Sequence, residues 1–104
     1  MNSAAPIPRV NGGLLRSFVG RRVRLVCRVA DLASGAVEAS DGIQVLVRFQ
    51  TGQPQTTYVE VIGIVESDGS IREEMTVSFG ETFHLQNYDQ VIQLSQQFPV
   101  PFSQ

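Results

Sequence analysis

The stretch RRVRLVCRVAD, residues 21–31, sets the fold class of this chain. Apolar side chains recur in it at every second position, at Val23, Leu25, Cys27 and Val29. The alternate positions 22, 24, 26 and 28 hold three arginines and one valine, so one side of the stretch is apolar and the other is mostly charged. A period of two is typical of a β-strand that buries one face. The stretch therefore predicts a half-buried strand with Cys27 on its inner face.

Four further strands are predicted downstream of this one. A short strand is predicted over residues 36–40, and Asp41-Gly42 after it favours a type I′ hairpin turn. Alternation predicts a strand over 43–50. The β-branched run 57–66 predicts another, in which Gly63 indicates a bulge or a tight bend. Residues 74–85 supply the fifth strand, so the sequence predicts a small closed or nearly closed barrel.

Two helical segments flank the predicted barrel. The spacing of Leu14, Leu15, Phe18 and Val19 predicts a short helical turn near the N-terminus. Near the C-terminus, Asn87 is a candidate N-cap of an amphipathic helix. The apolar arc of this helix contains Tyr88, Val91, Ile92, Leu94 and Phe98. The expected organisation is a flexible leader (1–8), a barrel (9–86), a helix (87–98) and a tail (99–104).

Composition narrows the classes of function. The 104 residues make one domain, with a net charge of −2 and arginine as the only basic residue type apart from one histidine. The single cysteine excludes a disulfide framework within the chain and a zinc site built from several cysteines. Apolar runs are too short to span a membrane. We expect a soluble, intracellular protein that holds no metal and no cofactor.

The sequence contains no recognisable catalytic constellation. Cys27 lies on the apolar side of its strand and is predicted to be a buried, inert thiol. His84 is expected at the surface, and Glu73 and Glu74 are expected to point apart in a solvated loop. No phosphate-binding glycine loop, metalloprotease motif or nucleophile elbow is present. We therefore expect a protein that is not an enzyme.

Two surfaces remain as candidate binding sites. Arg22, Arg24 and Arg28 share the charged side of one strand, where they would either contact nucleic-acid phosphates or merely face solvent. The C-terminal helix would pack its apolar arc either on its own barrel or on another chain. The loops predicted at the ends of the strands offer no aromatic residue on which a base could stack. Weak binding of single-stranded DNA by the isolated chain is therefore expected.

The order of several short motifs resembles the family of small subunits of replication protein A, the heterotrimeric complex that binds single-stranded DNA. The resemblance covers residues 9–102 and includes the openings RVN at 9–11 and FVG at 18–20, the turn SDG at 40–42, and the segments VEVIG at 59–63 and NYDQVI at 87–92. The chain departs from the family in lacking lysine and in a shorter, glutamine-rich stretch at 52–55.

The resemblance implies an all-β, five-stranded OB-fold with Greek-key topology in a nuclear heterotrimer. It implies that the C-terminal helix joins a three-helix bundle with the large and middle subunits, through Tyr88, Val91, Ile92, Leu94 and Phe98. Single-stranded DNA would be bound mainly by those partners, in support of DNA replication, repair and recombination. The alternatives are an autonomous nucleic-acid-binding OB module, such as a small telomere end-capping subunit, and a peptide-binding barrel unrelated to DNA.

Overall fold

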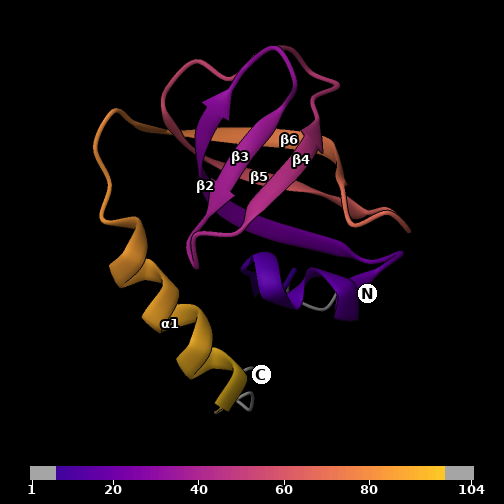
Figure 1. The fold of residues 1–104 in the computed structure, drawn as a ribbon, viewed down its shortest axis with the longest axis vertical. Coiled ribbons are helices and arrows are strands. Elements are labelled where there is room, and N and C mark those ends of the chain that lie inside the picture. Colours follow the sequence, from indigo (N-terminus) through magenta and orange to yellow (C-terminus); the bar gives the residue numbers. More distant parts are fainter. Residues whose placement is uncertain (1–6, 98–104) are drawn as a thin grey trace, which may run out of the picture.

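The computed structural model describes residues 7–97, and the side chains of residues 7–94. A six-stranded sheet is rolled into a barrel that α1 leaves at one end (Figure 1). The elements are β1 (Arg9–Val10), η1 (Gly12–Phe18), β2 (Arg22–Asp31), β3 (Ala36–Ala39), β4 (Gln44–Arg48), β5 (Tyr58–Val65), β6 (Ile71–Gly80) and α1 (Leu85–Gln97). None of the helices among these residues is long and apolar enough to cross a membrane.

The pairing of β2 with β5 closes the barrel. The strand order is β1-β2-β3-β4-β6-β5, and β2 also pairs antiparallel with β5 along most of its length, with Val23 opposite Gly63. The five long strands are the predicted OB-fold barrel, which is confirmed. The two-residue β1 was not predicted, and it pairs parallel with β2.

The inner face of β2 is the one that the alternation predicts. Val23, Leu25 and Cys27 are fully buried in the main apolar core, together with residues from every other strand of the barrel. Burial alone raises the pKa of the Cys27 thiol to about 12, so the thiol is neutral near pH 7. The prediction of a buried thiol is therefore confirmed.

Gly63 lies at an irregularity of the ladder between β5 and β6, as the sequence predicts. The register between these strands shifts between Ile62 and Gly63. A Cβ atom at position 63 would lie 2.3 Å from the carbonyl oxygen of Arg72, so only glycine allows this approach. On the two sides of the barrel wall, β6 pairs antiparallel with β5 along its length and parallel with β4 at Ile71 and Arg72.

Strand β6 begins three residues earlier than predicted, and this corrects the role of Glu73. The side chain of Glu73 is 1% exposed and points into the barrel, whereas that of Glu74 lies on the exposed outer side. The Glu73 carboxylate accepts hydrogen bonds from the backbone and side chain of Thr51 (3.0 and 2.6 Å), from the backbone of Gln50 (2.7 Å) and from Thr76 (2.7 Å). A solvated loop at this position was the wrong expectation.

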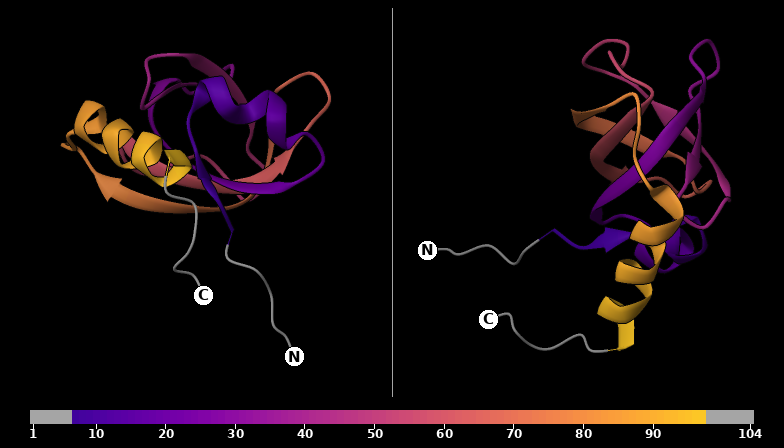
Figure 2. Two further views of the ribbon diagram at one scale, coloured as in Figure 1. Left: turned by 90° about the horizontal axis from the view of Figure 1, so that it is seen from below. Right: turned by 90° about the vertical axis from the view of Figure 1, so that its left-hand side faces the viewer.

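Helix α1 starts at Leu85, so the prediction that Asn87 is its N-cap is wrong. The backbone N–H of Tyr88 already donates to the carbonyl of His84, at 3.2 Å. The N-terminal turn is confirmed as the 3₁₀ helix η1, with Asn11 as its N-cap. Helix α1 and η1 lie at the same end of the barrel (Figure 2), and the side chain of Asn11, just before η1, donates a hydrogen bond to Asp89 of α1. Val26, on the outer side of β2, is 1% exposed, and α1 packs against that strand.

Candidate functional site

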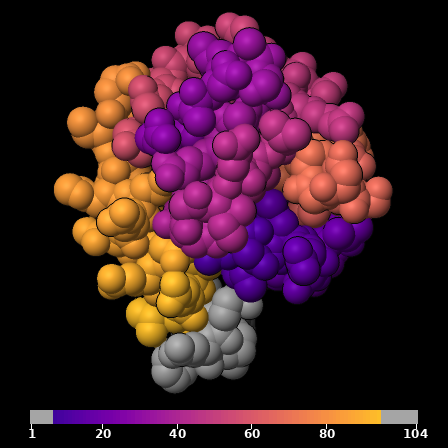
Figure 3. Space-filling model, viewed as in Figure 1, coloured from indigo at the N-terminus to yellow at the C-terminus, as the bar shows by residue number. Residues whose placement is uncertain are grey.

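The apolar residues of α1 are divided between two sides of the helix. Ile92 is 1% exposed and Tyr88 is half-buried, so this pair faces the barrel. Val91 and Leu94 are 53% and 54% exposed. The space-filling view shows α1 at the edge of the molecule, with its outer flank uncovered by the barrel (Figure 3). Phe98, the fifth residue of the predicted arc, lies outside the described residues.

A chain of aromatic contacts joins Tyr88 to the barrel. The ring of Phe83 lies 5.9 Å from that of Tyr88, 5.2 Å from that of Phe79 on β6 and 6.2 Å from that of Tyr58 on β5, between centroids. These distances are typical of tilted and edge-to-face pairs, which stabilise beyond their apolar area. Phe83 is not recognisable as a contact residue from the sequence alone, because its partners are spread over three elements.

A buried carboxylate makes the second connection between α1 and the barrel. Asp89 accepts hydrogen bonds from Asn11 Nδ2 (2.9 Å), from Ser40 Oγ (2.7 Å) and from Gln93 Nε2 (2.7 Å). We call these four residues the Asp89 cluster. Burial by itself raises the pKa of Asp89, but the three hydrogen bonds outweigh it and hold the pKa below its usual value. The carboxylate is therefore ionised near pH 7.

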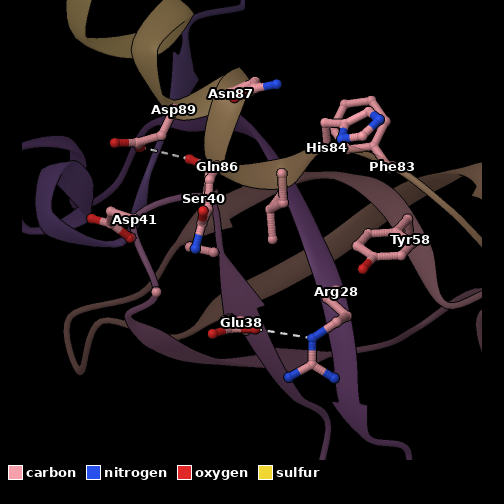
Figure 4. Close-up of a pocket in the computed structure, with 13 residues that line it drawn as sticks. Arg28, Glu38, Ser40, Asp41, Tyr58, Phe83, His84, Gln86, Asn87 and Asp89 are labelled. Atoms are coloured by element: carbon pink, nitrogen blue, oxygen red, sulfur yellow. Dashed lines mark hydrogen bonds and ion pairs between the residues drawn. The ribbon is translucent and has the colours of Figure 1, made fainter.

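A pocket of about 580 Å³ opens between the start of α1 and the outer side of β2 and β3 (Figure 4). Its lining includes Arg28, Glu38, Tyr58, His84 and Asp89. Glu38 binds Arg28 at 2.9 Å, and His84 is exposed, as the sequence predicts. Among the described residues, no group of three or more His, Cys, Asp or Glu side chains could hold a metal ion.

The three arginines proposed for phosphate contact all lie on the outer side of β2. Arg22 is paired with Glu74 through two contacts of 2.6 and 3.0 Å, and this carboxylate raises the pKa of Arg22. Arg28 is paired with Glu38. Arg24 has no carboxylate within 4.0 Å among the described residues, but its Nε is buried. Two of the three guanidinium groups are therefore already neutralised by the protein itself.

Positive charge without a paired carboxylate is found elsewhere on the described surface. Arg16 on η1 and Arg21 just before β2 are both exposed, and neither is among the ion pairs of the described residues. Arg21 lies 4.8 Å above the ring of Phe18. Neither arginine is among the residues predicted to contact phosphate, because neither lies on the alternating charged side of β2.

Comparisons with known proteins agree with this architecture. The family model described as replication factor A protein 3 matches residues 1–102. The replication protein A 14 kDa subunits A and B of Arabidopsis thaliana are 44% and 40% identical to this chain, over 98 and 97 residues, and each alignment covers 91% of this chain and 92% of the relative.

Solved structures share the fold of this chain. A chain in the structure of U. maydis replication protein A bound to ssDNA is similar with a TM-score of 0.85 and 27% identity, over 93% of this chain and 95% of that chain. A chain of the S. pombe Stn1-ten1 complex has a TM-score of 0.66 at 14% identity, over 91% of this chain and 96% of that chain. The second likeness shows a shared fold alone.

Proposed function

Because the chain belongs to the replication factor A protein 3 family, we propose that it is the structural small subunit of a replication protein A heterotrimer. It assembles with the large and middle subunits through the exposed side of α1, which forms one helix of a three-helix bundle. In the nucleus, this complex would bind single-stranded DNA and support replication, repair and recombination. The proposed role is structural and requires no catalytic group.

The observation that carries this proposal is the uncovered apolar side of α1. Val91 and Leu94 remain more than half exposed although the helix already packs on the barrel through Ile92. In the sequence, Phe98 continues this stripe four residues after Leu94. Burying the exposed halves of Val91 and Leu94 would contribute about 2 kcal/mol of gross stabilisation. A helix packing in the same way from each partner would add further apolar area.

The charges of β2 favour DNA binding mainly through the partner subunits. Arg22 and Arg28 are paired with carboxylates of the same chain, and a phosphate would have to displace those partners. Arg22, Arg24 and Arg28 remain our candidates for any secondary contact with phosphates in the complex. Such a contact would be weak and sensitive to salt.

The test is assembly of the double variant Val91→Asp/Leu94→Asp with the large and middle subunits. Two unpaired charges buried in a helix bundle should weaken assembly at least about a hundredfold. Leu46→Asp is the matched control, because Leu46 is 51% exposed on the barrel, outside α1. Co-purification followed by native mass determination should recover a trimer with the control and not with the double variant. A trimer containing the double variant would show that this side of α1 is not the interface.

A further inference from the structure

We propose that Asp89 positions α1 for assembly, by fixing which side of the helix faces the partner subunits. The inference rests on the proposed function, because it concerns how Val91 and Leu94 are presented. Asp89 itself would contact no partner. It would act through the barrel, as a positioning residue.

The Asp89 cluster connects parts of the chain that are distant in sequence. Asn11 caps η1 and Ser40 follows β3, and they lie 78 and 49 residues from Asp89. The exposed fractions of Asp89, Asn11 and Ser40 are only 7%, 8% and 4%. Hydrogen bonds to an ionised carboxylate are short and strong when they are shielded from water. Two bonds from the barrel therefore hold one position of α1 in place, and Figure 4 shows the one between Ser40 and Asp89.

The direction of these bonds determines which residues lie on the outward side of α1. At 100° per residue, Val91 and Leu94 lie about 200° and about 140° around the axis from Asp89. They therefore point away from the barrel when Asp89 points into it. Their exposure of 53% and 54% agrees with this placement. A rotation of the helix that removed Asp89 from its donors would turn Val91 and Leu94 away from their outward direction.

The apolar contact of α1 with the barrel is not sufficient to fix this direction. Burial of Ile92 is favourable, but apolar contacts have little directional preference and tolerate rotation. A helix of 13 residues is also marginal in water when it stands alone. The carboxylate supplies the directional element, because it is stabilised only where both Asn11 and Ser40 reach it.

A fixed helix lowers the cost of assembly. If only a fraction of the free subunits holds α1 in the binding-competent position, the apparent affinity falls by that fraction. Removing the Asp89 carboxylate leaves two buried donors of the barrel without their acceptor, which disfavours the docked helix. A docked fraction reduced to about one tenth would weaken assembly about tenfold.

The experiment measures two quantities on the full chain carrying Asp89→Ala. Hydrogen–deuterium exchange of the free subunit reports whether α1 remains docked, and a titration with the preassembled large and middle subunits reports affinity. We expect faster exchange in α1, unchanged exchange in β5, and about tenfold weaker assembly. Asp31→Ala is the matched control, because the exposed carboxylate of Asp31, at the end of β2, accepts hydrogen bonds from Ala33 and Ser34 in the adjacent turn, far from α1 in sequence.

Wild-type affinity in the Asp89→Ala variant would overturn the inference, and so would weaker assembly with unchanged exchange in α1. If that variant does not fold, Ser40→Ala removes a single donor and is judged by the same two measurements, with a smaller effect in the same direction. Val91→Asp/Leu94→Asp separates the two proposals: it should leave the exchange of α1 unchanged and still abolish assembly. Normal assembly of that double variant would refute the proposed interface, whatever the role of Asp89.

Discussion

Replacement of Glu73 tests whether this buried carboxylate stabilises the barrel. Its Oε1 accepts the backbone N–H groups of Gln50 and Thr51, and its Oε2 accepts the hydroxyls of Thr51 and Thr76. In Glu73→Ala the hydroxyls can turn to other acceptors, but the two amides keep their direction. Each bond to a charged acceptor contributes about 1.5–3 kcal/mol, so the alanine variant should lose about 3–6 kcal/mol.

Glu73→Gln should lose much less, because an amide oxygen can replace Oε1 while the amide nitrogen donates to the two hydroxyls. The pKa of Glu73 lies below its usual value: burial raises it, but the hydrogen bonds from Thr51, Thr76 and Gln50 outweigh that effect. A lowered pKa means that the carboxylate stabilises the fold above its unfolded pKa, and that this contribution is lost as the pH falls through the folded pKa. The difference between the wild type and the glutamine variant should therefore shrink below about pH 4.5.

Urea unfolding of the full chain measures the stability of both variants. The urea concentration at the midpoint should shift, and the slope of the unfolding free energy against urea concentration should stay unchanged. Glu74→Ala is the control, since Glu74 lies next in sequence but on the exposed side of β6, and its loss should change the midpoint less. An alanine variant that unfolds at the wild-type urea concentration would refute the reasoning. A glutamine variant as unstable as the alanine variant would refute the assignment of Oε1 to the backbone amides.

Two further predictions concern reactivity and DNA. Cys27 should not react with thiol reagents in the native protein and should react once the chain unfolds, because burial raises its pKa to about 12; rapid labelling of the native protein would contradict the register of β2. The isolated chain should bind a labelled single-stranded oligonucleotide weakly even at about 50 mM salt, where phosphate contacts are strongest. Tight binding that is lost on replacing Arg22, Arg24 and Arg28 would instead support an autonomous nucleic-acid-binding module.

The parts of the fold that depend on local pattern could be predicted from the sequence. The inward direction of Cys27 follows from a period of two, because alternation along a strand is imposed by the backbone itself. The bend at Gly63 follows from the one residue type that permits a close backbone approach. The helical turn near the N-terminus follows from the spacing of Leu14, Leu15 and Phe18, which is local to the segment.

The rest depends on residues that are far apart in the sequence. Glu73 was expected in a solvated loop, because nothing near it indicates that Gln50 and Thr51 would supply donors. Asp89 resembles an ordinary first-turn charge, and its burial depends on Asn11, which lies 78 residues away. The sequence left open whether α1 packs on its own barrel or on a partner. The structure shows that Ile92 packs on the barrel while Val91 remains uncovered.

The distance between Asp89 and its donors along the chain has a consequence for biosynthesis. Asn11 and Ser40 leave the ribosome long before Asp89, and every strand of the barrel precedes α1. The donors are therefore made before the carboxylate that they bind. Val91 and Leu94, the surface that we propose for assembly, also follow every strand of the barrel in the chain. A nascent chain with an unfinished barrel would thus not yet carry that surface, and partner subunits would bind only chains whose barrel strands have all been synthesised.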